Sequence, residues 1–125
     1  MIVVTGDRGH QLVRARISGF LTPEDVRKFE ADKISAAAAM GLGSGAFNLL
    51  VETTDGVIHS AHVVAEFTRV VLKSAFKSKR MAVVRPTNLT RMQSRRILNV
   101  RDNAATFETV EEAERWLFSP APETV

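Results

Sequence analysis

Three side chains that can bind metals or transfer protons recur at helical spacing in the middle of the chain. His59, His62 and Glu66 are three and four positions apart, so a helix would place them on one face. Imidazole and carboxylate groups are ligands that zinc accepts, but the His-Glu-x-x-His pattern is absent and no third ligand from another element is evident. We therefore expect neither a metal site nor a cofactor, and interpret the three side chains as a solvated stripe in which Glu66 screens His62.

Asp55, His59 and Ser60 supply the residue types of a nucleophilic hydrolase without its arrangement. Neighbouring His59 and Ser60 would point about 100° apart on a helix, and the Gly-x-Ser-x-Gly pattern does not occur. The absence of cysteine excludes a thiolate nucleophile. We therefore predict a protein without catalytic residues.

Strands and helices alternate along the chain. Its 125 residues, 45% of them hydrophobic, favour one globular domain over residues 1–125. Short apolar runs predict strands, and Thr22-Pro23 and Thr109 are typical of helix starts. We expect strands at 2–5, 11–18, 47–51, 81–84 and about 106–107, and helices at 23–41, 58–77, 88–98 and after 109. This order, ββαβαβαβα, predicts an α/β sandwich with a mixed, mostly parallel sheet of about five strands and about four helices.

One corner of this fold is the expected binding site. Ligands of open α/β sheets usually bind beyond the carboxyl ends of the strands, beside helix N-termini. That rule selects the residues that follow the strand at 47–51: Glu52, Thr53, Thr54, Asp55, His59 and Ser60. Free N–H groups at a helix start favour an anion, although the two carboxylates partly oppose it. The alternative is that Thr54 or Asp55 only shapes the turn and caps the helix.

The predicted helix at 58–77 is apolar over more than half of its circumference, which exceeds what one sheet covers. We expect its apolar surface to contact a protein partner or to line a cavity for a nonpolar, lipid-like ligand. The residues concerned are Val63, Val64, Phe67 and Val71. The alternatives are a cover formed by a neighbouring helix or by a second subunit, the latter making a homodimer.

Basic residues dominate the region from Phe67 to Arg101, which contains no Asp or Glu. This asymmetry favours an anionic partner, with a solvated face as the alternative. Arg91, Arg95 and Leu98 share an outward helix face suited to peripheral contact with an anionic membrane. Tyr is absent and the one Trp is predicted to anchor the core, so we expect no nucleic-acid partner.

Three segments carry a resemblance to a known family. They are residues 19–25 (Gly-Phe-Leu-Thr-Pro-Glu-Asp), 49–52 (Leu-Leu-Val-Glu) and 111–117 (Glu-Glu-Ala-Glu-Arg-Trp-Leu). Over about residues 3–118 the chain resembles the SpoIIAA-like, or STAS-like, proteins. The resemblance implies a small α/β sandwich shared with anti-sigma-factor antagonists and distantly similar to CRAL-TRIO lipid-transfer domains. The antagonists carry an Asp-Ser-Ser-Gly-like phosphoacceptor motif, and Ser60 lies near its position here without the flanking Asp, second Ser and Gly.

Two functions fit these observations. The first is a non-enzymatic regulatory module that acts through protein interaction, and the alternative is a carrier of a nonpolar ligand that associates with anionic membranes. An enzyme acting on a small anionic substrate ranks third. The N-terminus lacks a basic leader followed by a long apolar run, and no stretch of about 18 apolar residues occurs, so we expect a cytoplasmic protein.

Overall fold

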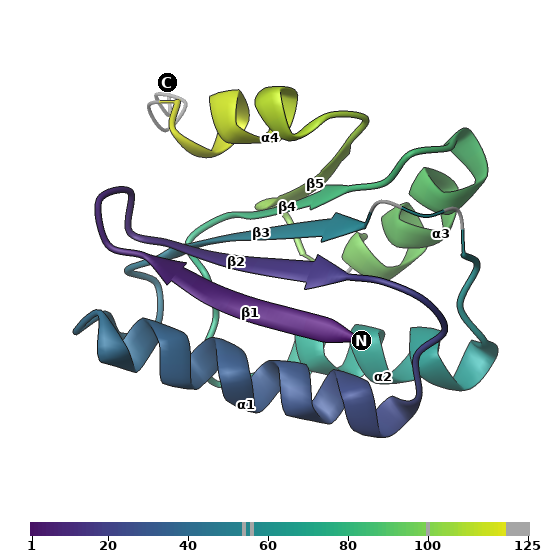
Figure 1. The fold of residues 1–125 in the computed structure, drawn as a ribbon, viewed down its shortest axis with the longest axis horizontal. Helices are drawn as coiled ribbons and strands as arrows, with labels where there is room; N and C mark the ends of the chain where they lie inside the picture. Colours follow the sequence, from purple (N-terminus) through teal and green to yellow (C-terminus); the bar gives the residue numbers. More distant parts are fainter. Residues whose placement is uncertain (54, 56, 100, 120–125) are drawn as a thin grey trace.

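The chain forms a five-stranded sheet with helices on both faces (Figure 1). The structure is a computed structural model that describes residues 1–53, 55, 57–99 and 101–119. Strand β1 is antiparallel to β2, and all other neighbouring pairs are parallel. The predicted α/β class, mixed sheet and element order are confirmed. In sheet order the strands are β1 (Ile2–Asp7), β2 (Leu12–Ile17), β3 (Asn48–Thr53), β4 (Met81–Val84) and β5 (Ala104–Phe107).

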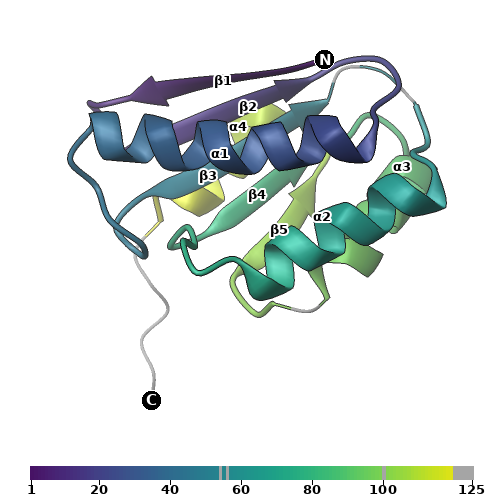
Figure 2. The same ribbon diagram turned by 90° about the horizontal axis from the view of Figure 1, so that it is seen from below.

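Three helices cover one face of the sheet and a fourth covers part of the other (Figures 1 and 2). The three are α1 (Pro23–Ala39), α2 (Ala61–Lys73) and α3 (Asn88–Leu98), and the fourth is α4 (Val110–Leu117). Parallel strands need cover on both faces, and each face has its own apolar core. The larger core includes Phe29, Phe47 and Val63, whereas the smaller one lies beneath α4 around Leu50 and Leu117.

Helix α2 is shorter than the predicted helix at 58–77, which is therefore wrong at both ends. It begins after Ser60, whose backbone is extended and whose Oγ accepts the N–H of Val63 at 3.2 Å. It ends at Ser74, where the backbone is again extended and the hydroxyl accepts the N–H of Phe76. The apolar periodicity continues past both caps, but the hydrogen bonds of the two serines stop the helix.

The expectation that α2 presents an apolar docking surface is also wrong for most of its residues. Val63, Phe67 and Val71 are buried within this single chain, and Val64 is partly buried against the same core. Helices α1 and α3 flank α2, and its buried side chains share one core with residues of the sheet. These neighbours cover an arc that one sheet would leave exposed. The structure supports two of the expected alternatives: neighbouring helices cover most of the apolar arc, and Phe67 and Val71 line a small cavity.

Truncation on the two sides of α2 should therefore have very different consequences. Phe67→Ala removes a buried ring and is expected to lower the free energy of unfolding by about 3–5 kcal/mol. Leu72→Ala changes a side chain of the same helix that is 47% exposed, and it should stay within about 0.5 kcal/mol of the parent protein. Urea denaturation of both variants measures the contrast. Equal losses would show that α2 is not packed as described.

Candidate ligand-binding site

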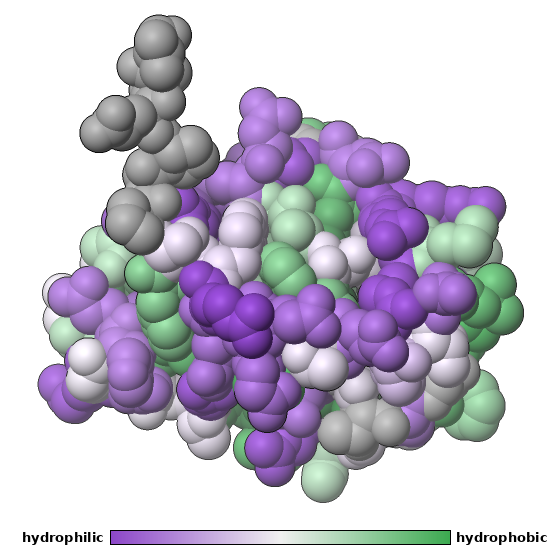
Figure 3. Space-filling model, turned by 90° about the horizontal axis from the view of Figure 1, so that it is seen from above, coloured by the Kyte–Doolittle hydropathy of each residue, from purple (hydrophilic) through white to green (hydrophobic). Residues whose placement is uncertain are grey.

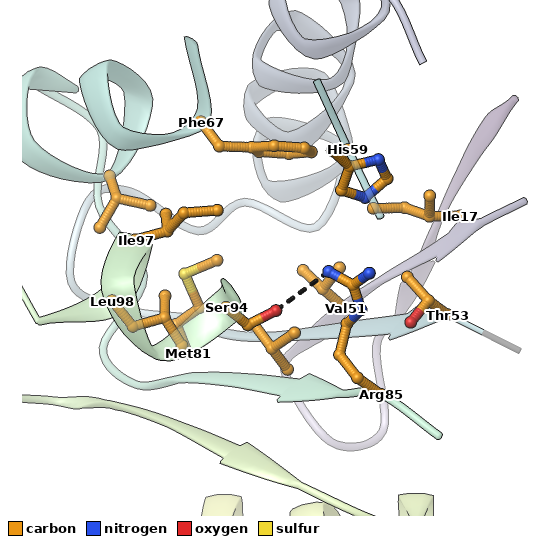
Figure 4. Close-up of a pocket in the computed structure, with 12 residues that line it drawn as sticks. Ile17, Val51, Thr53, His59, Phe67, Met81, Arg85, Ser94, Ile97 and Leu98 are labelled. Atoms are coloured by element: carbon orange, nitrogen blue, oxygen red, sulfur yellow. Dashed lines mark hydrogen bonds between the residues drawn. The ribbon is translucent and has the colours of Figure 1, made fainter. Parts of the chain in front are cut away.

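A small cavity lies where β2, β3 and β4 end, between the sheet and the inner sides of α2 and α3 (Figure 4). Its volume is about 40 Å³, enough for about three water molecules. Apolar side chains form most of the wall, among them Ile17, Val51, Phe67, Met81, Ile97 and Leu98. The polar side chains in the wall are Thr53, His59, Arg85 and Ser94. The cavity thus combines an apolar interior with a polar end at the carboxyl edge of the sheet.

Arg85 is a buried cation in this wall. It follows β4 directly and is only 3% exposed. Its Nη1 donates to Ser94 Oγ at 3.1 Å and its Nη2 donates to the backbone oxygen of Val57 at 2.7 Å. Its Nε, also buried, has no hydrogen-bond partner among the residues that the structure describes. Burial lowers the pKa of Arg85 and the negative charge of Asp55 partly offsets this, but a guanidinium remains protonated at neutral pH.

His59 lies opposite Arg85 in the same wall (Figure 4). Its backbone is fixed by Gln93 of α3, which accepts the His59 N–H at 3.1 Å and donates to the His59 oxygen at 3.0 Å. The imidazole is buried, its Nδ1 has no hydrogen-bond partner in the described part of the chain, and the centre of its ring lies 5.9 Å from that of Phe67. Burial lowers the pKa of His59, the charge of Arg85 lowers it further, and that of Asp55 raises it. The folded protein therefore favours the neutral imidazole.

Only some residues of the predicted corner line the cavity. Thr53 and His59 line the cavity, and Thr53 Oγ1 donates to the backbone of Val84 at 3.0 Å. Glu52 Oε2 lies 3.7 Å from Arg16 Nε, and Glu52 lines a groove on the opposite face of the sheet. The prediction that Glu52 belongs to the site is therefore wrong. Thr54 lies outside the described residues.

Asp55 and Ser60 have structural contacts, in line with the alternative that turn and cap residues shape this corner. Asp55 Oδ2 accepts the N–H of Gly19 at 2.8 Å and Oδ1 accepts that of Val57 at 3.4 Å. Gly19 has φ of 70°, a left-handed conformation that favours glycine. Ser60 is exposed and caps α2. These two residues position the segment that closes the cavity.

Arg91, Arg95 and Leu98 were predicted to share an outward face, and this prediction is wrong for Leu98. Leu98 is 4% exposed and lines the cavity, because the last turn of α3 packs against the sheet beside Ile97. Arg91 is half-buried and donates to the backbone oxygen of Arg85 at 2.9 Å. Arg95 is exposed, as predicted.

Sequence reasoning missed Arg85, Ser94 and Gln93. Arg85 follows the buried strand at 81–84 and so meets the same strand-end rule that selected Thr53. It was grouped instead with the other basic residues of its region, because charge alone does not reveal burial. Ser94 and Gln93 carry no such signal, since their roles depend on how α3 is placed.

In the described ranges, no three His, Asp or Glu side chains gather as a metal site requires. None of the helices in the same ranges is long and apolar enough to cross a bilayer.

Comparison with known proteins agrees with the fold. A family model described as SpoIIAA-like matches residues 12–118, most of the chain. The chain belongs to the SpoIIAA-like family. The match includes every residue of the cavity wall, from Ile17 to Leu98, so the cavity lies within the family domain.

One solved structure has the same SpoIIAA-like fold. It is the crystal structure of an uncharacterized protein of the DUF3478 family from Shewanella loihica PV-4. The identity is 21%, the TM-score is 0.65, and the alignment covers 94% of this chain and 92% of the other. At that identity the likeness concerns the fold alone. A comparison with curated proteins finds no match.

The environment of His59 makes stability depend on pH. The pKa is below its ordinary value of 6.5 in the folded protein, so the unfolded chain binds a proton first as the pH falls. The contribution of the neutral His59 to the free energy of unfolding is complete above about pH 6.5. It is lost as the pH falls towards the pKa that His59 has in the folded protein. When the pH is lowered from about 7.5 to 5.5, the free energy of unfolding should therefore decrease less in His59→Gln than in the parent protein. The midpoints of urea denaturation measure this, and identical pH dependence would contradict the neutral, buried imidazole.

Proposed function

We propose that this SpoIIAA-like chain is a non-enzymatic binding module that takes up a small anion with a short apolar part. The single observation that carries the proposal is a pair of buried nitrogens, Arg85 Nε and His59 Nδ1, in the wall of an apolar cavity. Neither has a hydrogen-bond partner within the described ranges. Buried polar atoms without partners are rare in folded proteins, and an unresolved ligand or water is a common cause. Both nitrogens are buried within the wall, so an anion in the cavity would satisfy them once the Arg85 and His59 side chains turn towards it.

Charge favours an anion over water alone. Removing a guanidinium from water costs several kcal/mol, which a nearby carboxylate normally offsets. Among the described residues, no carboxylate forms an ion pair with Arg85, and Asp55 acts on it only at longer range. A carboxylate that enters the cavity would supply the missing charge, with Nε as one donor and the Nδ1–H tautomer of the neutral His59 as a second.

Size limits the apolar part of the ligand. A volume of about 40 Å³, room for about three water molecules, limits the apolar part to about a methyl group beside the anionic head unless the wall moves, and excludes a long acyl chain. The apolar wall of Phe67, Met81 and Ile97 supports uptake of such a group. The alternative function, carriage of a nonpolar ligand, is therefore proposed here only for short ligands.

The same geometry supports a regulatory role through protein contact. Residues 57–60 close the cavity through Arg85 and Gln93, while Ile58 and Ser60 of that segment face solvent. An anion that draws Arg85 away from the Val57 oxygen would change the exposed side of the segment. We propose Asp55 and residues 57–60 as the surface that a regulatory partner recognises.

Titration with defined anions tests the cavity. Acetate, butyrate, hexanoate and inorganic phosphate are added in turn while ¹H–¹⁵N NMR follows the backbone amide signals of Thr53 and Ser94 in the cavity wall, which every variant keeps, and the Nε–H signal of Arg85 where that side chain is present. We expect saturable shifts, strongest for a short-chain carboxylate. Arg85→Gln should weaken binding by roughly ten- to a hundredfold, the range for a lost charge-assisted hydrogen bond. Arg115→Gln removes an exposed charge of α4 as the matched control and should bind normally.

A second variant tests the site even if Arg85→Gln does not fold. His59→Gln keeps the guanidinium and should still bind, but with weakened affinity. The absence of a saturable shift with all four anions would leave water as the occupant and overturn the proposal. Equal affinity in Arg85→Gln and in the parent would do the same.

A further inference from the structure

Strand β1 forms an open edge of the sheet. Among the described residues its only strand neighbour is β2, and in Figure 2 it runs along the outer edge of the sheet, beyond α1. Such an edge exposes backbone N–H and C=O groups that can pair with another strand. The opposite edge is better protected, because β5 has only four residues, all half-buried, and contacts both α3 and α4.

The hydrogen bonds of β1 show which of its backbone groups face outward. The nitrogen of Met1 donates to the Ser18 oxygen at 2.7 Å, and the Ser18 N–H donates to the Met1 oxygen at 2.9 Å. In an antiparallel pair of strands, residues that exchange two such bonds alternate with residues that exchange none. Every second residue from position 3 onward is therefore bonded to β2. The residues between them direct their N–H and C=O groups to the free edge, and they are Ile2, Val4 and Gly6.

These outward groups are symmetric about Val4. When a second copy lies antiparallel with its Val4 opposite Val4, Ile2 of each copy lies opposite Gly6 of the other. Every outward N–H and C=O group of both strands is then paired. A two-fold axis through the Val4 pair relates the copies, as in most dimers of identical chains. Residues 2–6 contain no proline and no charged residue, and no bulge interrupts the register, so the usual protections of an edge strand are missing.

The surface beside this edge can accept a second copy. A shallow groove of about 590 Å³ lies between β1 and α1. Its lining residues are Ile2, Val3, Val4, Lys28, Asp32, Ser35 and Ala36. Lys28 Nζ lies 2.8 Å from Asp32 Oδ2, so the two charges cancel and an identical chain meets no net like charge there. The small side chains of Ser35 and Ala36 leave room for side chains of the second copy.

The contact area fits a reversible dimer. A six-residue strand is about 20 Å long and packed layers lie about 10 Å apart, so each copy would contribute roughly 200–300 Å². A stable interface needs about 800 Å² from each partner, whereas transient complexes have less. A second copy is favoured over an extended peptide, because its strand is already ordered and a free peptide loses conformational freedom on binding.

We propose that two copies of this chain associate through their β1 strands, antiparallel and with Val4 opposite Val4, to form one continuous sheet. This dimer differs from the one expected at α2, since most of the apolar surface of α2 is covered within one chain. It does not depend on whether the cavity binds an anion, because the cavity lies between the sheet, α2 and α3.

Analytical ultracentrifugation and hydrogen exchange test this pairing. We expect the average mass to rise reversibly with concentration, from that of one chain towards that of two. In the dimer, ¹H–¹⁵N NMR should show slower exchange for the amides of Ile2, Val4 and Gly6, because these groups gain partners. The amides of Val3 and Thr5 are bonded to β2 in both states, so their exchange should depend much less on concentration.

Two double variants test the register. In the proposed dimer, Val3 of each copy lies opposite Thr5 of the other, and both side chains are exposed. Val3→Lys with Thr5→Lys places like charges opposite each other, whereas Val3→Lys with Thr5→Glu places opposite charges there. The first variant should dimerise at least roughly tenfold more weakly than the second. Hydrophilic side chains cover much of this face of the molecule (Figure 3), so both variants should keep the fold.

A control variant separates this effect from net charge. Asp102→Asn with Glu108→Gln, beside β5 at the opposite edge, raises the net charge as much as the two lysines do and should dimerise like the parent. A chain that stays monomeric at every concentration would leave the edge to an extended peptide of another protein and overturn the proposal. So would a dimer in which the amides at positions 2, 4 and 6 exchange as in the monomer, or equal affinity in the two double variants.

Discussion

The buried guanidinium of Arg85 connects the parts of this protein on which a binding role depends. It extends from the end of β4, donates to the Val57 oxygen ahead of α2, and donates to Ser94 of α3. These hydrogen bonds hold the segment at 57–60 against the carboxyl edge of the sheet and so define the cavity. A buried charge is costly unless it is paired or hydrogen-bonded, so the groups around Arg85 must be placed to accept its hydrogen bonds. The charge of Arg85 also lowers the pKa of His59.

A second buried cation shows what is unusual about Arg85. Lys33 of α1 is 4% exposed, and its Nζ lies 2.7 Å from Glu30 Oε2. Burial lowers the pKa of Lys33, and Glu30 opposes that change at close range. Arg85 is equally buried, but its described partners are a hydroxyl and a backbone oxygen. The protein thus neutralises one buried cation internally and leaves the other, in the wall of a cavity, with a nitrogen that has no partner among the described residues. This difference is the physical basis of the proposed anion site.

Local patterns predicted much of the fold and failed where the chain left its pattern. The strand at 81–84 and the helix at 88–98 have the predicted bounds, since a short apolar run before a proline and a polar cap before a periodic segment are strong signals. The helix at 58–77 was predicted too long, because Ile58 and Phe76 continue its apolar period outside the caps. Periodicity shows which residues would share a face but not where hydrogen bonds from Ser60 and Ser74 end the helix.

The sequence by itself determined the order of strands and helices, the mostly parallel sheet and the edge at which a site would lie, because these follow from short-range patterns and from the chirality of strand connections. Only the tertiary structure decided which residues meet at that edge. Arg85, His59 and Ser94 come from three separate elements, and Leu98 turned inward because the end of α3 packs on the sheet. Whether a charge or an apolar side chain is buried depends on neighbours that are distant in the chain, and no local pattern contains that information.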